Sequence, residues 1–154
     1  MPVYMNWGAS EPPKIQGDVN ERGHARWIEL QSVSWGLQRS ARAEEKEASA
    51  PTFSEIIVTK LQDKSSHSLF REAMSGQPTD VTIDFVKTDE GGPLVWMKYK
   101  LVKALISSHS MSGSAHGENR PIESFSINFT KLDYGPGVTP HTGNPPATTY
   151  PGIP

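Results

Sequence analysis

RPIESFSINFTKLDY, residues 120–134, is the stretch that decides the fold. In its middle, apolar and polar side chains alternate strictly, which predicts a β-strand with one buried face and one open face. The open face carries hydroxyl and amide groups but no charge, whereas a solvated strand face usually carries Lys and Glu. Such a face suits a surface that is wet but lies close to another subunit, another layer or passing cargo. The apolar positions are Phe125, Ile127 and Phe129, and the polar positions are Ser124, Ser126, Asn128 and Thr130.

Length and composition exclude several classes of protein. A chain of 154 residues is expected to form one domain. The formal charge of -2 argues against nucleic-acid binding, which usually requires a basic excess. Without cysteine, the chain has neither a disulfide nor a thiolate metal site. No apolar run approaches the ~18 residues of a membrane helix, and the N-terminus lacks the basic-then-apolar order of a secretory signal. Export would therefore need a dedicated machine.

Five further strands follow from the hydrophobic pattern. In Arg26–Gln38 the alternation changes phase after Leu30, which predicts a β-bulge or a sharp bend near Gln31 or Ser32. A bend of this kind lets one strand serve two sheets or close a barrel. Asp89–Pro93 is a turn sequence that predicts a hairpin. The expected strands are Val3–Trp7, Arg26–Gln38, Thr52–Leu61, Asp80–Thr88 and Leu94–Ser108, in the last of which Val95, Met97, Tyr99 and Leu101 are expected to share a face.

One helix is expected, at Lys64–Gly76. Ser66 is a suitable N-cap residue, and Gly76 stands where a left-handed residue often ends a helix. A narrow apolar stripe is expected to dock on the sheet, because a helix of about three turns is marginal alone. The stripe consists of Leu69, Phe70, Ala73 and Met74.

The pattern therefore predicts a mainly β domain over residues 1–134: a small β-barrel or sandwich of about six or more antiparallel strands with one flanking α-helix. Residues 135–154 contain six Pro and four Gly and are expected to form an extended tail. Residues 39–51, RSARAEEKEASAP, have no aliphatic side chain larger than Ala. They are either a solvated loop or an arm that orders against a neighbouring subunit.

Signals for catalysis are weak, so no catalytic residue, metal or cofactor is expected. No serine lies in a G-x-S-x-G elbow, and no phosphate-binding loop is present. His109 and His116, with Glu118, come nearest to a metal site, but loop residues of this kind are usually solvated. Trp27 and Trp35 form either a sugar-stacking platform or ordinary core and interface aromatics.

Three motifs resemble the haemolysin-coregulated protein (Hcp) family, the tube protein of type VI secretion systems. They are GHARWIELQSVSWG (Gly23–Gly36), VTKLQDKSSHSLFREAMSG (Val58–Gly76) and the opening stretch. The resemblance runs from about Val3 to Tyr134. It departs from the family at His67, where Pro is frequent, and in the GASEPPK segment and the tail.

The resemblance implies a fold like that of phage tail-tube proteins and a structural function without catalysis. Hexameric rings would stack into a tube inside a contractile sheath on a baseplate, with a spike at the tip and effector proteins as cargo. Assembly in the bacterial cytoplasm and secretion without a signal peptide are implied, with no nucleic acid and no membrane insertion. Small neutral side chains at Ser34 and Ser114 are expected to face the lumen. The arm is expected to contact neighbouring copies through Arg39, Arg42, Glu44, Glu45, Lys46 and Glu47.

Two other functions remain open at this level. One is a tube subunit of a related contractile particle or phage tail. The other is an all-β binding module, such as a carbohydrate binder that uses the Trp side chains and stays monomeric.

Overall fold

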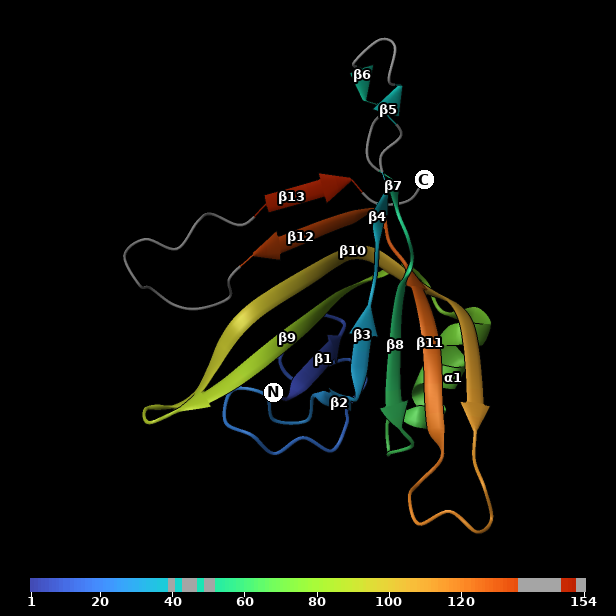
Figure 1. The fold of residues 1–154 in the computed structure, drawn as a ribbon. Coiled ribbons are helices and arrows are strands. Elements are labelled where there is room, and N and C mark those ends of the chain that lie inside the picture. The colour runs from blue at the N-terminus through green and yellow to red at the C-terminus, as the bar shows by residue number, and fades with distance from the viewer. Residues whose placement is uncertain (39–40, 43–46, 49–51, 136–147, 152–154) are drawn as a thin grey trace.

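The computed structural model covers the whole chain and describes all residues except 39–40, 43–46, 49–51, 136–147 and 152–154. The described part is mainly β, with antiparallel strands and a single short helix on one side, as the sequence predicts (Figure 1). The elements are β1 Val3–Trp7, β2 Ile28–Leu30, β3 Ser32–Ser34, β4 Leu37–Gln38, β5 Ala41–Arg42, β6 Glu47–Ala48, β7 Thr52–Phe53, β8 Ile56–Leu61, α1 Ser66–Ser75, β9 Thr79–Asp89, β10 Gly92–Ser112, β11 Ile122–Asn128, β12 Lys131–Gly135 and β13 Thr148–Pro151.

One large sheet contains nine of these strands and has two halves. Its order is β2-β1-β9-β10-β11-β8-β3; off this path, β12 pairs with the first part of β10, and β13 pairs with β12. The strand β10 belongs to both halves, because residues 92–104 pair with β9 and residues 105–112 pair with β11. The two halves diverge from the middle of β10 and enclose the core between them (Figure 1).

The strand order is open, so hydrogen bonds do not close the sheet into the barrel that the sequence analysis allowed. Its two ends, β2 and β3, are nevertheless consecutive in the chain, with Gln31 alone between them. The backbone N–H of Gln31 donates to the carbonyl of Thr59 at 2.7 Å. This residue carries the chain from β1 to β8, which confirms the bend predicted from the phase change.

A second bend lies in β10, where its pairing with β9 shifts between Leu101 and Ala104. Lys103 has a φ of 53°, in the left-handed region that non-glycine residues rarely adopt. Its N–H donates to Asp80 Oδ1 at 3.2 Å. The bend turns β10 from one half of the sheet into the other.

The opening stretch of sequence was expected to be one strand, but the structure divides it into β11 and β12 beside this bend. Both the N–H and the hydroxyl of Thr130 donate to the carbonyl of Val102, at 3.0 and 3.1 Å. These two bonds interrupt the ladder at the point where β10 changes sheet.

A bulge also corrects the face expected for Val95. The register of β10 against β9 shifts between Val95, opposite Val86, and Met97, opposite Phe85. Because Val86 and Phe85 point to opposite faces, Val95 does not share a face with Met97. The inserted residue is Trp96, which is 49% exposed.

The helix begins and ends differently from the expectation. Ser65 precedes its first turn without a side-chain cap, and Ser66 is its first residue. Gly76 is extended, with φ −68° and ψ 153°, and not left-handed. A Cβ atom on Gly76 would lie 2.6 Å from the carbonyl oxygen of Glu72. Glycine is therefore required there for a close approach and not for a positive φ.

The apolar stripe of α1 docks only in part. Leu69 is fully buried in the core and Ala73 packs at its margin. Phe70 and Met74 stay 47% and 72% exposed, so the expected docking of all four side chains is wrong. The helix lies over one margin of the sheet, and only its inner side reaches the core (Figure 1).

The bend at Lys103 predicts an unusual response to substitution. Lys103→Gly should leave the free energy of unfolding unchanged or raise it by up to about 1 kcal/mol, because glycine adopts a positive φ without a Cβ clash. Lys103→Val should lower it by about 1–3 kcal/mol, because a β-branched residue is strained there. Urea unfolding followed by tryptophan fluorescence measures both variants. Equal losses in the two variants would contradict the assigned strain.

Candidate functional site

Hydroxyl side chains dominate the middle of the outer side of the half-sheet β3-β8-β11-β10, with exposed Ile57 among them and exposed Leu105 and Ile122 on either side. Each strand alternates, so that Val58 and Phe125 point into the core while Thr59 and Ser124 point outward. The pairing places the outward residues of four strands in rows. One row is Ser32, Thr59, Ser124 and Ser110, and the next is Ser34, Ile57, Ser126 and Ser108. We call these two rows the hydroxyl face.

Neither row of the hydroxyl face contains a charged side chain, and few hydrogen bonds engage its hydroxyl groups. The hydroxyls of Ser32 and Thr59 bind each other across β3 and β8. At one end, Glu55 approaches the surface, and its Oε2 accepts a hydrogen bond of 2.8 Å from Ser107 Oγ. Ser107 is the bulged residue of β10 in its pairing with β11. The surface is therefore neutral and, apart from the exposed Ile57, made of short hydroxyl side chains.

The structure separates the two serines that were expected to face a lumen. Ser34 lies in the hydroxyl face and is exposed. Ser114 is exposed too, but it lies in the loop of residues 113–121 between β10 and β11, beyond the end of the rows. The expected arm falls mostly outside the described residues, which exclude Arg39, Glu44, Glu45 and Lys46. Within it, Arg42 of β5 is paired in register with Glu47 of β6.

Sequence reasoning missed most of the hydroxyl face. Ser124 and Ser126 stand out in an alternating strand, whereas Thr59 lies in a strand with apolar residues on both faces. Ser108 and Ser110 were covered only by the observation that no serine lies in a nucleophile elbow, and neither was assigned to a strand face. Their alternation with the core-side residues 109 and 111 was a usable signal. The assembly of rows from four strands depends on pairing between distant segments, which the local pattern does not contain.

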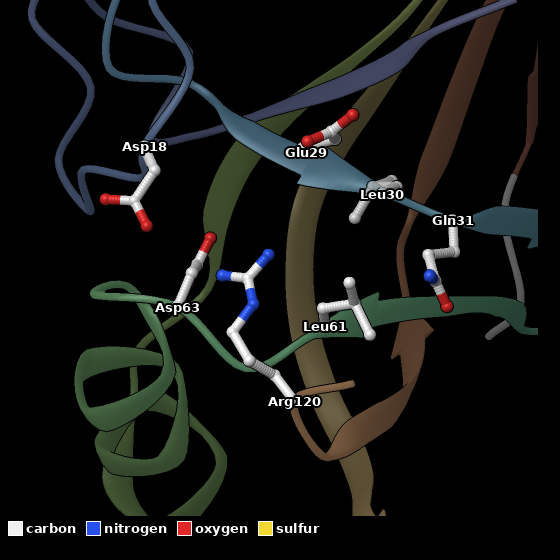
Figure 2. A pocket seen from close by; sticks show the side chains of 7 residues that line it. All are labelled: Asp18, Glu29, Leu30, Gln31, Leu61, Asp63 and Arg120. Atoms are coloured by element: carbon white, nitrogen blue, oxygen red, sulfur yellow. The ribbon is translucent and has the colours of Figure 1, made fainter. Parts of the chain in front are cut away.

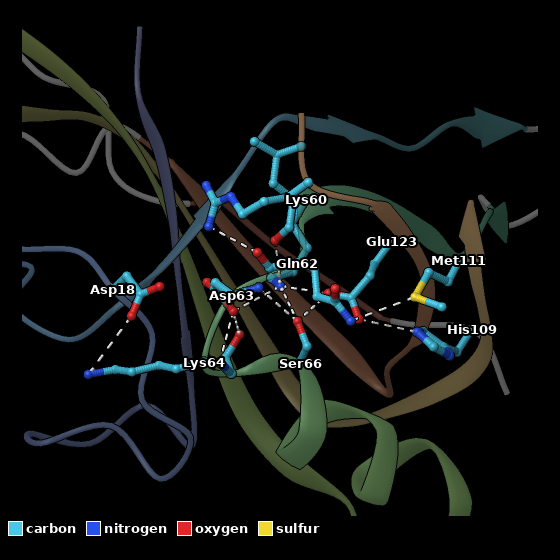
Figure 3. A network of polar contacts seen from close by, with 12 residues as sticks. Asp18, Lys60, Gln62, Asp63, Lys64, Ser66, His109, Met111 and Glu123 are labelled. Carbon is cyan, nitrogen blue, oxygen red and sulfur yellow. Dashed lines mark hydrogen bonds and ion pairs between the residues drawn. The ribbon is translucent and has the colours of Figure 1, made fainter. Parts of the chain in front are cut away.

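Directly behind the hydroxyl face lies a buried charged cluster (Figure 3). Lys60 and Glu123 are opposite each other in β8 and β11, and Lys60 Nζ donates to Glu123 Oε2 at 2.7 Å. The same ammonium group, which is completely buried, also donates to Asp63 Oδ1 at 3.0 Å, Ser66 Oγ at 3.2 Å and the carbonyl of Leu61 at 2.9 Å. Its charge is thus compensated by two carboxylates, as a buried charge requires.

This cluster attaches the helix to the sheet. Ser66 Oγ donates to Glu123 Oε2 at 2.7 Å and accepts from the N–H of Asp63 at 2.9 Å. His109 Nε2 lies 3.5 Å from Glu123 Oε1, and its ring stacks on Phe125 with centroids 4.7 Å apart. Strands β8, β10 and β11 and the start of α1 are therefore held by one network, which keeps the outer face in register.

A charged cavity of about 120 Å³ lies near the end of the half-sheet, where β2 and β8 diverge (Figure 2). The guanidinium of Arg120 projects into it, between the carboxylates of Asp18, Asp63 and Glu29. Arg120 Nη1 donates to the carbonyl of Gln62 at 2.9 Å. The cavity is acidic on balance and contrasts with the neutral hydroxyl face.

The alternative chemistries find little support in the described residues. Outside the masked segments, no group of three or more His, Asp or Glu side chains is arranged to hold a metal ion. Trp27 is buried, and its Nε1 donates to Glu11 Oε1 at 2.9 Å. Trp35 belongs to a different cluster, so the two rings do not form one sugar-binding platform. The part of the chain that the structure describes also contains no helix long and apolar enough to span a bilayer.

Comparison with known families gives one match that covers most of the chain. A family model described as "Type VI secretion system effector, Hcp" matches residues 4–134. No curated protein matches the sequence. The model match spans all three motifs from which the resemblance was drawn, and it confirms that resemblance.

Solved structures share the fold at low sequence identity. The structure of a type six secretion system protein is 20% identical, with a TM-score of 0.84 over 97% of this chain and 94% of that chain. A type VI secretion system effector from Yersinia pestis is 19% identical, with a TM-score of 0.73 over 97% and 98%. Hcp1 from Salmonella typhimurium is 19% identical, with a TM-score of 0.72 over 96% and 91%. At these identities the likeness establishes the fold alone.

The buried cluster predicts a double-mutant pattern. Lys60→Met should lower the free energy of unfolding by about 3–5 kcal/mol, because Glu123 is left buried without its counterion. Adding Glu123→Leu should restore part of the loss, since it removes one of the two carboxylates that Lys60 compensates, while Asp63 keeps its hydrogen bond from the N–H of Ser65. Lys87→Met, at an exposed lysine of β9, is the matched control and should change the free energy by less than about 0.5 kcal/mol. Urea unfolding gives all three values, and a Lys60→Met loss no larger than the control would contradict the assigned role.

Proposed function

We propose, because this chain belongs to the Hcp family of the type VI secretion system, that it forms closed rings whose hydroxyl faces line a central channel. Members of this family are secreted structural tube proteins and not enzymes. In this function the chain acts by associating with other copies of itself and not through reactive side chains.

One observation carries the proposal: the half-sheet with the hydroxyl face has two open edges that run in opposite directions. Within the described residues, β3 pairs only with β8, and residues 105–112 of β10 pair only with β11. All pairs along β3-β8-β11-β10 are antiparallel, so β3 and β10 are antiparallel to each other. The edge of β10 in one copy can therefore continue onto β3 of the next as an ordinary antiparallel pair.

The rows support the same arrangement. Ser110 and Ser32 end one row, and Ser108 and Ser34 end the other. Pairing of copies in this register would continue both rows across each boundary. Each copy contributes four strands, and six copies, the number that the family resemblance implies, would exceed the roughly 16–18 strands that already enclose an aqueous channel in porins. Short neutral side chains along such a channel wall would bind cargo weakly.

Stacking of rings into a tube needs contacts at both ends of the half-sheet. The hairpin of β5 and β6 lies beyond one end, and the loop of residues 113–121 lies beyond the other (Figure 1). In the proposed tube these segments of successive rings meet. Tube growth inside a sheath and on a baseplate, a spike at the tip and effector proteins in the channel complete the proposed function.

Ring formation and the channel are tested together by cysteine protection, since the chain has no native thiol. Ser34→Cys should react with a bulky polyethylene glycol maleimide in the monomer and resist it after assembly, while a small maleimide labels it in both states. Asn20→Cys, in the exposed loop before β2, is the control and should react with both reagents throughout. Ser114→Cys tests whether the loop also faces the channel. Electron microscopy identifies the rings.

Two outcomes would contradict the proposal. A species that stays monomeric at high concentration would exclude the ring. Rings in which the bulky reagent still labels Ser34→Cys at the monomer rate would exclude the hydroxyl face as the channel wall.

The arm is tested by deletion. Removal of Ala41–Glu47 should weaken ring or stack formation, because it removes the charged segment that we place between copies. The folded monomer should keep its thermal transition, since the segment contributes nothing to the described core. Size-exclusion chromatography and negative-stain imaging measure assembly. Unchanged rings and stacks would show that the arm is a solvated loop.

A further inference from the structure

We propose that Phe70 and Met74 of helix α1 pack against the aromatic patch of the next copy in the ring, the patch being formed by Trp35, Phe85, Tyr99 and Tyr134. This inference rests on the proposed ring and adds a second layer of contact behind its strands. The proposed contact would also bury Phe70 and Met74, the two side chains of the apolar stripe that are exposed in the monomer.

The helix contributes a small apolar surface beside one open edge. Phe70 and Met74 are 47% and 72% exposed and lie one turn apart on the same side of α1. The ring of Phe70 contacts His109 edge-on, with centroids 5.8 Å apart. Because His109 belongs to the part of β10 with the open edge, Phe70 stands next to that edge on the core side of the half-sheet.

The aromatic patch lies beside the other open edge. Trp35 follows β3 directly, and its ring contacts Tyr99 and Tyr134 edge-on, with centroids 6.0 Å apart in each pair. Tyr99 stacks on Tyr134 at 5.0 Å and contacts Phe85 at 5.4 Å. All four rings are only half-buried although they pack against the core. Burial raises the pKa of the Tyr99 phenol, so the patch stays uncharged over the ordinary pH range.

The strand edges bring these two surfaces together. Phe70 and Trp35 lie on the same side of the half-sheet, opposite to the hydroxyl face, and beside its opposite edges. When β10 of one copy pairs with β3 of the next at the usual spacing of about 4.8 Å, the core sides of both edges become neighbours. Helix α1, beside the β10 edge of one copy, then faces the aromatic patch beside the β3 edge of the next copy.

The binding partner that fits the aromatic patch is a second copy of this chain. The contact is continuous with the strand pairing that closes the ring, and it needs no further protein. Both surfaces are uncharged, and the side chains suit each other, because Phe pairs edge-on with aromatic rings and a thioether packs well at a ring edge. Contact through two different surfaces is also what a head-to-tail ring requires.

Cross-linking between introduced cysteines tests the contact. Met97 lies opposite Phe85 in the register of β10 and β9 and therefore shares the face of the patch. In the variant Met74→Cys/Met97→Cys, a short bismaleimide should join neighbouring copies into a ladder that ends at the ring. The matched control is Met74→Cys/Lys100→Cys, whose second thiol lies on the opposite face of β10. It should give at least tenfold less ladder.

The outcomes separate this inference from the proposed ring. Intact rings in the microscope with no more ladder than the control would overturn the helix contact and leave the ring in place. Absence of rings in the unmodified protein would overturn the proposed function itself. A second variant, Phe70→Ser/Met74→Ser, should raise the concentration needed for ring formation at least tenfold, while the monomer, which loses only the contact of Phe70 with His109, still unfolds in one cooperative thermal transition. Unchanged assembly of this variant would also overturn the inference.

Discussion

The buried ion pair of Lys60 and Glu123 reverses the usual arrangement of a two-faced sheet. Sheets normally keep charges on the open face and apolar or small groups inside. Here the charged residues of β8 and β11 point inward, and their neighbours Thr59 and Ser124 point outward. Because side chains alternate with a period of two, a slip of one residue would move Lys and Glu to the outer face and hydroxyls into the core. The ion pair therefore fixes the register on which the neutral face depends.

Neighbouring residues compensate the desolvation of the buried Lys60 charge. A buried ammonium group needs more than one acceptor, and Asp63 and Ser66 supply the others from the segment that begins the helix. The helix start is thus part of the charge compensation and not a separate element laid on the sheet. This explains why Ser66 does not act as an ordinary N-cap: its hydroxyl is already engaged with Glu123 and the N–H of Asp63.

Sequence patterns predicted the parts of the fold that local alternation controls. The phase change after Leu30 located the bend at Gln31, because a bend must occur wherever the apolar face changes side. The break at Thr130 was missed although the sequence carries the same signal, because the apolar positions shift from Phe129 to Leu132 across it. Its structural cause is the bend of β10, a distant strand, which the local pattern does not contain. The left-handed end at Gly76 was expected because glycine is common there, yet the actual reason for glycine is the carbonyl of Glu72. For the candidate site, Ser34 and the serines of β11 were accessible from the pattern, whereas their rows depend on the order of four strands.

The monomer has features that are unfavourable for an isolated protein and suitable for a ring. Open strand edges invite uncontrolled pairing, and exposed apolar side chains such as Phe70 invite association. Head-to-tail contact between copies would pair the open strand edges and bury the exposed apolar side chains. Such contact closes into a ring only if the rotation between successive copies returns to the first copy; otherwise it forms an open filament. In this chain the β10 and β3 edges are the two sides of one four-stranded half-sheet. The angle between successive copies in the proposed ring therefore depends on the twist of that half-sheet.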